Sequence, residues 1–292
     1  MPYISLFFAL ILFTACSDTQ SIQMKKTKIE SIDEFGQFFE DLNYTSSNWK
    51  SKHKEVPRLH LEEISETWKT ASETIPVKDK KSIFFRLITP LVLISNEAIL
   101  EERKRLQKEP INSEWMKKLA IKYRVLSKNE TSLTEEKLEK LKIRVDIIPP
   151  SLALVQTAAE TGWGTSRFAS EGNALFGQWD FSGDGMRPEE QRSGLGDYGL
   201  ARFDTPLDAV KSYMLNLNTT SAYTHLRMLR QDLRNKDVKI TGWELAKSLD
   251  RYSERGQAYI NSLHDMMSYN KLQSVDYAYL SPDTTIHLIT VR

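Results

Sequence analysis

The stretch 151–164, SLALVQTAAETGWG, constrains the fold of this 292-residue chain more than any other. Two prolines end whatever precedes it, and Ser151 is a good N-cap for a helix that begins at Leu152. Small and apolar side chains recur at helical spacing, so one face of this helix is expected to pack closely. Gly162 is a typical helix terminator, and it places Glu160 in the last turn. The sequence therefore predicts a packed helix with a carboxyl group at its C-terminal end.

This position bears on the proton affinity of Glu160. The negative end of a helix dipole disfavours a carboxylate, and the neighbouring Trp163 would exclude water. Both effects raise the pKa of Glu160, and a glycosidase needs such a protonated carboxyl group to protonate a leaving glycosidic oxygen. Taken alone, however, a glutamate near a helix end is more often a solvated or paired surface group.

A longer segment around this helix is similar to a known family. Residues 148–179 read IPPSLALVQTAAETGWGTSRFASEGNALFGQW. They closely resemble the glucosaminidase superfamily, glycoside hydrolase family 73, and its Bax-like branch in particular. In that family the glutamate of the E-S/T-G-W-G turn is the catalytic acid, and Glu160 stands at that position. Residues 217–230, LNTTSAYTHLRMLR, and residues 252–260, YSERGQAYI, resemble the same branch.

The resemblance implies a mainly α, lysozyme-like α+β fold, in which a helical body and a small β-hairpin lobe flank a substrate groove. The glycines agree with this, because nine of the twelve lie between residues 162 and 199, interleaved with aromatic residues. Such runs are typical of short strands and turns. We expect strands over 174–181 and 198–203, joined by a loop over 182–196.

The resemblance also implies the reaction. Members of the family cleave the β-1,4 bond after N-acetylglucosamine in the glycan strands of peptidoglycan. We therefore expect an endo-β-N-acetylglucosaminidase with Glu160 as the general acid. An inverting route needs a carboxylate base across the groove, about 6.5–9.5 Å from the acid. The candidates, each of which fits a solvated loop charge better, are Asp184, Glu189, Glu190 and Asp197.

In a second route, which the family tolerates, the 2-acetamido group of the substrate attacks the anomeric carbon. A tyrosine on the helical side then helps to orient the sugar, and Tyr223 matches that residue. A tyrosine that packs its ring in the core with its hydroxyl bonded fits Tyr223 equally well.

Five further residues are candidates for substrate binding. Trp163 and Trp179 offer flat faces for sugar rings, although Trp163 fits equally well as a structural wedge behind Glu160. The run N-x-L-F-G resembles the cleft wall of the family, where backbone and amide groups would hold acetamido oxygens. Its members are Asn173, Phe176 and Gly177.

Two other functions stay open. A lytic transglycosylase shares the single acid and the fold. A non-catalytic wall-binding or regulatory lipoprotein would keep the groove for binding only.

The N-terminus predicts export. Residues 1–15 contain an apolar run of signal-peptide length that is too short to span a bilayer. Residues 13–16, FTAC, resemble a bacterial lipobox, so Cys16, the single cysteine, is the predicted lipid-attachment site. A plain secretory signal is the alternative. We expect a membrane-anchored monomer in the cell envelope, facing the periplasm or the cell exterior, with residues 16–30 as a tether.

Composition excludes other classes. A net charge of +1 points to no nucleic-acid partner. The five histidines show no metal-ligand spacing, so neither a metal nor another cofactor is expected.

The remaining boundaries follow from periodicity. Residues 31–144 form an N-terminal helical region, 145–275 the glucosaminidase-like catalytic domain and 276–292 a C-terminal tail. Within the first region helices are expected over 56–68 and 80–108, the latter kinked or broken by Pro90. In the tail, residues 285–291 fit either an edge strand or a disordered end.

Overall fold

A computed structural model gives the fold of residues 25–45, 54–180, 182–188, 198–250 and 254–290. The expected signal peptide and Cys16 lie outside these described residues, as do three of the loop carboxylates, Glu189, Glu190 and Asp197. The described part is mainly helical with small sheets, which confirms the expected fold class.

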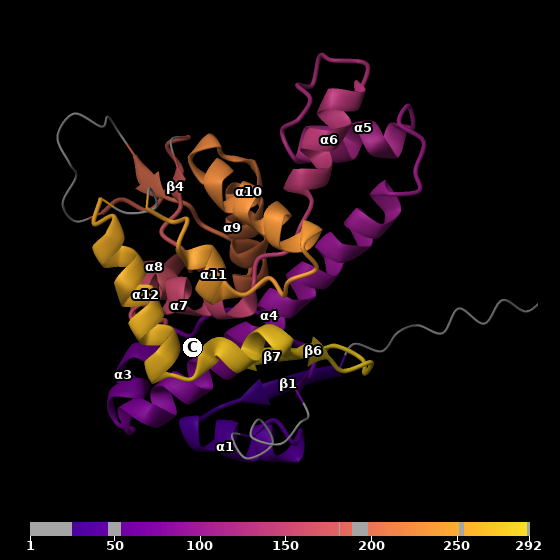
Figure 1. Cartoon of the computed structure of the whole chain (residues 1–292). Coiled ribbons are helices and arrows are strands. Elements are labelled where there is room, and N and C mark those ends of the chain that lie inside the picture. The colour runs from indigo at the N-terminus through magenta and orange to yellow at the C-terminus, as the bar shows by residue number, and fades with distance from the viewer. Residues whose placement is uncertain (1–24, 46–53, 181, 189–197, 251–253, 291–292) are drawn as a thin grey trace, which may run out of the picture.

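Helix α4, Val77–Leu106, runs the length of the protein (Figure 1). It continues through Pro90, so of the two predicted outcomes, a kink or a break, the break does not occur. By length and composition α4 is apolar enough to cross a membrane, and 67% of its most apolar window is buried inside the protein. Its apolar side chains therefore serve as core.

Helix α7, Pro150–Thr161, packs against α4, α11 (Gly242–Ala246), α12 (Gln257–Tyr269) and the 3₁₀ turn η2 (Leu272–Tyr277). Only Ala159 and Glu160 of its residues are exposed. The predicted apolar face is packed as expected, and the packing extends beyond it, because neighbours surround the helix everywhere except at its last turn.

The start of α7 also differs from the prediction. The helix begins at Pro150, with Pro149 as its N-cap, so Ser151 lies inside the first turn. The backbone N–H and the hydroxyl of Ser151 both donate to the buried carboxylate of Asp276, each over 2.8 Å. The same carboxylate accepts from the N–H of Gly242 at 2.9 Å. Asp276 thus joins the first turn of α7 to the start of α11.

A three-stranded parallel sheet joins both ends of the chain (Figure 1). Its order is β1 (Lys25–Ile29), β7 (Ile286–Thr290), β3 (Leu59–Leu61), which makes β7 the central strand rather than an edge strand or a disordered end. The sequence assigns residues 25–29 to the tether, but here they pair with β7 along their whole length.

The expected helix over 56–68 is also wrong. Residues 55–61 form β2 (Glu55–Val56) and β3, and β2 pairs with β6 (Tyr279–Leu280). Periodicity does not separate a short apolar strand from a helical segment, and the strand partners lie more than 200 positions away.

The predicted hairpin forms, but its strands are short. β4, Trp179–Asp180, pairs antiparallel with β5, Gly199–Leu200, and Met186 bridges to Leu200. A Cβ atom at Gly199 would lie 2.6 Å from the carbonyl carbon of Gly185, so glycine is required where these segments cross.

The remaining helices complete the body. They are α1 (Ile32–Asp41), α3 (Trp68–Glu73), α5 (Glu114–Lys122), α6 (Glu135–Arg144), α8 (Arg167–Gly172), α9 (Pro206–Thr219), the 3₁₀ turn η1 (Ser221–Tyr223) and α10 (Thr224–Asn235).

A buried ionic cluster lies where α6 leads into α7. Asp146 accepts two hydrogen bonds from Arg234 and lies 3.7 Å from Arg103 and 3.9 Å from Arg230. Burial raises the pKa of Asp146, but the charge of Arg230 and the other two arginines outweigh it and hold the pKa below its usual value. The Asp146 carboxylate therefore joins α4 and α10 to the segment that leads into α7.

Candidate active site

The turn after α7 fixes the position of Glu160. Gly162 ends the helix in the left-handed region, at φ +58°, as predicted. Trp163 follows at φ +61°, and its carbonyl accepts a 2.8 Å hydrogen bond from the indole N–H of Trp68. The hydroxyl of Thr161 accepts from the N–H of Gly164 at 2.8 Å. These contacts therefore fix both the last turn of α7 and the loop that follows it.

Gly177 lies against the acid. A Cβ atom at this position would lie 3.5 Å from Oε2 of Glu160, and the backbone adopts φ +58°, which favours glycine. The fold thus brings together two residues that the sequence singled out separately.

The proton affinity of Glu160 is raised in the direction that the sequence predicts. The residue is exposed, yet the protein atoms around its carboxyl group displace water and raise its pKa above the ordinary value. A hydrogen bond with Tyr259 opposes this shift in part.

Three tyrosines gather around the acid. Burial raises the pKa of each, and the negative charge of Glu160 adds to the rise for Tyr213, Tyr223 and Tyr259. Tyr223 is half-buried in η1 and interacts with Asn216, so the expected site tyrosine lies close enough to Glu160 for their charges to couple. Sequence reasoning found Tyr223 and missed the other two.

Gln156 connects two of these tyrosines beneath the acid. The hydroxyl of Tyr213 donates to Oε1 of Gln156, and Nε2 of Gln156 donates to the hydroxyl of Tyr259 at 3.1 Å. Gln156 is fully buried one helical turn before Glu160. That spacing places it on the same face of α7, which is the sequence signal that identifies it in retrospect.

Phe176 and Asn173 lie below the surface rather than on it. The ring of Phe176 is buried and stacks on Tyr213, with centroids 3.8 Å apart. Asn173 accepts from the N–H of Ile64 at 3.1 Å and donates to the carbonyls of Phe203 and Asp204. Both side chains support the site, and this placement favours support over the direct substrate contact that the sequence predicts.

The two candidate tryptophans differ in exposure. Trp179 on β4 exposes 48% of its surface, and its ring centroid lies 4.5 Å from that of Tyr198. Trp163 packs partly buried against the core, with Nζ of Lys81 4.6 Å above its ring. The interpretation of Trp163 as a structural wedge therefore fits better, and Trp179 is the more exposed of the two.

The partner carboxylate of an inverting route is not assigned. Asp184 is exposed in the hairpin loop, and its backbone N–H donates to the hydroxyl of Ser182. A separate group with metal-ligand chemistry, which consists of His60, Glu62 and His287, lies on other elements.

The sequence has relatives among known proteins. Residues 135–279 match the family model for glucosaminidase, described as mannosyl-glycoprotein endo-beta-N-acetylglucosaminidase. The chain is 32% identical over 199 residues to "Protein bax" of Escherichia coli K12, covering 66% of this chain and 70% of that protein.

The chain belongs to the glucosaminidase family.

Membership in this family places the chain among glycosidases, as the resemblance implied. A solved structure, the catalytic domain of the autolysin Auto from Listeria monocytogenes, is similar at 15% identity. That alignment covers 60% of this chain and 96% of the other, with a TM-score of 0.33. The region that matches the family model contains α7, the hairpin and α9 to α12, so it includes Glu160, Gly177 and all three tyrosines.

Proposed function

We propose that this protein is an endo-β-N-acetylglucosaminidase that cleaves peptidoglycan glycan strands, with Glu160 as the general acid. The observation that carries the proposal is the environment of Glu160. Its carboxyl group has a raised pKa, lies at the exposed end of a buried helix and is flanked by Gly177 and three tyrosines. A glycosidase acid has to hold its proton more strongly than an ordinary carboxyl group and still reach the substrate, and the raised pKa and exposed position of Glu160 support both requirements.

The chemistry needs one proton donor and one group that stabilises the developing oxocarbenium centre. Glu160 would transfer its proton to the glycosidic oxygen as the bond to the anomeric carbon breaks. In the substrate-assisted route, the carbonyl oxygen of the 2-acetamido group forms a bond to that carbon. Water then adds to the anomeric carbon, the bond from that carbon to the acetamido oxygen breaks so that the acetamido group is restored, and a proton of the water returns to Glu160. Tyr223 would hold the acetamido group, because its half-buried side chain lies close enough to Glu160 for their charges to couple.

Substrate binding is proposed for the hairpin side. The exposed ring of Trp179 would stack on a sugar, since flat apolar faces of sugars pack on aromatic rings. Gly177 would leave room for the sugar next to the acid.

Export to the cell envelope and lipid attachment at Cys16 belong to the same proposal, because peptidoglycan lies outside the cytoplasm. Replacing Cys16 with alanine should abolish incorporation of labelled palmitate, and unchanged labelling would refute the anchor.

The test is digestion of purified sacculi by the wild type and by Glu160→Gln. The variant should lose at least about a hundredfold in rate. Glu171→Gln is the matched control, because Glu171 is exposed and its carboxylate forms a surface ion pair with Arg167. Equal solubilisation by the wild type and Glu160→Gln would remove Glu160 from its role.

Mass spectrometry of the products separates the alternatives. Reducing N-acetylglucosamine ends support the proposal, and 1,6-anhydromuramic ends indicate a lytic transglycosylase. Binding to sacculi without any release indicates a wall-binding module.

A further inference from the structure

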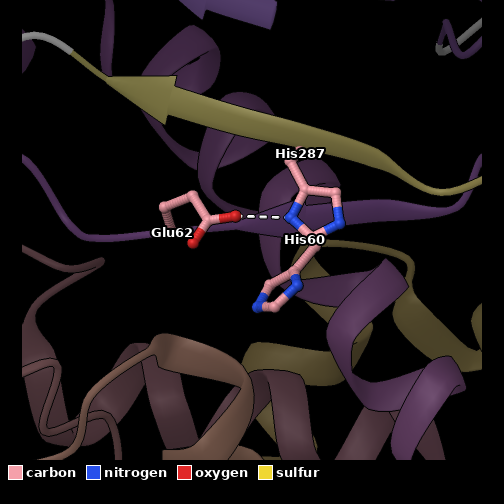
Figure 2. A group of neighbouring side chains, drawn as sticks. All are labelled: His60, Glu62 and His287. Atoms are coloured by element: carbon pink, nitrogen blue, oxygen red, sulfur yellow. Dashed lines mark hydrogen bonds and ion pairs between the residues drawn. The ribbon is translucent and has the colours of Figure 1, made fainter. Parts of the chain in front are cut away.

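A group of three side chains from two strands has the composition of a metal site. His60 and His287 are register partners in the parallel pair β3–β7. Glu62 follows two residues after His60, and its backbone N–H donates to the carbonyl of Leu288 at 3.0 Å, which extends the ladder. Because side chains alternate between the two faces of a strand, all three project from the face opposite the buried Leu59 and Leu61. Figure 2 shows them converging.

The three side chains are already close. Nδ1 of His287 lies 2.5 Å from Oε1 of Glu62, and the two imidazole centroids are 4.8 Å apart. One ligand atom from each residue lies within 4.8 Å of the others. Donors bound tetrahedrally to Zn²⁺ lie about 3.4 Å from one another. Small side-chain rotations would bring the three ligand atoms to this spacing.

His60 supplies an independent indication. Its Nε2 is buried and has no hydrogen-bond partner in the described part of the protein. A buried ring nitrogen without a partner is costly, so we assign Nε2 as the atom that His60 would offer to a cation.

The charges around the group are mixed. Asp208 and Lys211 on α9 both interact electrostatically with His60. Lys26 on β1 pairs in register with His287. Glu62 supplies the single carboxylate within the group, so a dication there would be only partly neutralised by its ligands.

We propose that His60, Glu62 and His287 bind one Zn²⁺, with water as the fourth ligand. The bound ion would link β3 to β7. Two imidazoles and one carboxylate form a ligand set that suits zinc. Zinc at Nδ1 of His287 requires the ring proton to move to Nε2, which leaves the ring neutral. The zinc ion would connect segments that lie 225 positions apart in the sequence. The expectation that the histidines bind no metal is thereby revised, because β-strand register brings together two of them that the sequence separates.

The experiment uses the full chain, stripped with a chelator and dialysed. Titration with zinc chloride, followed by metal analysis, should give about one zinc per chain. The melting temperature should rise by about 5 °C at roughly a hundredfold excess over the dissociation constant. Cobalt(II) should give the visible absorption of a tetrahedral site with nitrogen and oxygen ligands.

Variants identify the ligands. His60→Gln, His287→Gln and Glu62→Gln should each lower zinc affinity at least about tenfold, whereas His225→Gln, at an exposed histidine on α10, should retain it. Circular dichroism without zinc checks that each variant is folded. If the wild type binds zinc substoichiometrically or shows no tetrahedral cobalt spectrum, the proposal fails regardless of how the variants fold. Retention of full affinity by folded His60→Gln would also overturn it, and the contact between Glu62 and His287 would then be an ion pair alone.

Discussion

Gly177 and Glu160 meet at the mouth of the candidate site: a Cβ atom at position 177 would lie 3.5 Å from Oε2 of the acid. Because this is ordinary van der Waals contact, the two positions are as close as side-chain packing allows. The left-handed backbone of Gly177 therefore has two roles, since it forms the turn and it leaves the acid uncovered.

Replacing Gly177 with alanine tests this relationship. Alanine at φ +58° costs about 1 kcal/mol of unfolding free energy, and its methyl group would touch the Glu160 carboxyl group and partly cover it. We expect activity on sacculi to fall by about tenfold. Gly183→Ala is the control, because Gly183 has φ +98° and a methyl group there would meet no atom of the described residues within 4 Å, so this variant reports backbone strain. Equal loss of activity in the two variants would contradict a specific effect on Glu160.

Tyr259→Phe should change the pH profile. The hydrogen bond with Tyr259 lowers the pKa of Glu160, so its loss should raise that pKa further and move the alkaline limb of kcat to higher pH. The variant also leaves Nε2 of Gln156 without its acceptor, which costs about 1–3 kcal/mol. Tyr277→Phe, at an exposed tyrosine, is the control. An alkaline limb that stays in place or moves to lower pH would contradict the hydrogen bond between Tyr259 and Glu160.

Glu160 itself makes stability depend on pH. Its pKa is higher in the folded protein than in the unfolded chain, so its contribution is fully present below the unfolded pKa. That contribution is lost as the pH rises through the folded pKa. Urea unfolding across this range should therefore show Glu160→Gln gaining stability relative to the wild type as the pH rises, and a constant difference would contradict the raised pKa.

Asp146→Asn should destabilise the protein by about 3–5 kcal/mol, because it leaves the buried Arg230 without a negative partner. The pKa of Asp146 is lowered in the folded state, so its contribution is present above the unfolded value of about 3.9 and is lost as the pH falls. Urea unfolding at neutral and acidic pH measures both effects. Asp232→Asn, at an exposed pair with Lys236, should change stability by less than about 1 kcal/mol.

Gly242→Ala should also lower the free energy of unfolding strongly. A Cβ atom there would lie 2.1 Å from Oγ of Ser151 and 2.5 Å from the backbone nitrogen of Leu152, so α7 and α11 would have to separate. We expect a loss of about 3 kcal/mol in thermal or urea unfolding. Gly36→Ala, in α1 with nothing within 4 Å, should instead stabilise by about 0.5–1 kcal/mol. A similar response in both variants would contradict close packing at Gly242.

The sequence by itself determined the features that depend on neighbouring residues. Gly162 ends α7 because few other residues adopt its left-handed conformation readily, and this places Glu160 in an exposed last turn. The glycine-rich hairpin and the long apolar helix α4 follow from local composition in the same way.

Only the tertiary structure decided which distant groups meet. The partners of Gln156 are tyrosines 57 and 103 positions away, and neither pairing leaves a local pattern in the chain. His60 and His287 meet because β7 returns as the central strand of the first sheet, where the sequence allowed an edge strand or a disordered end. Local propensity acts over a few residues, whereas strand register and burial depend on the whole chain, which is why the position of Glu160 in an exposed last turn was predictable and its surroundings were not.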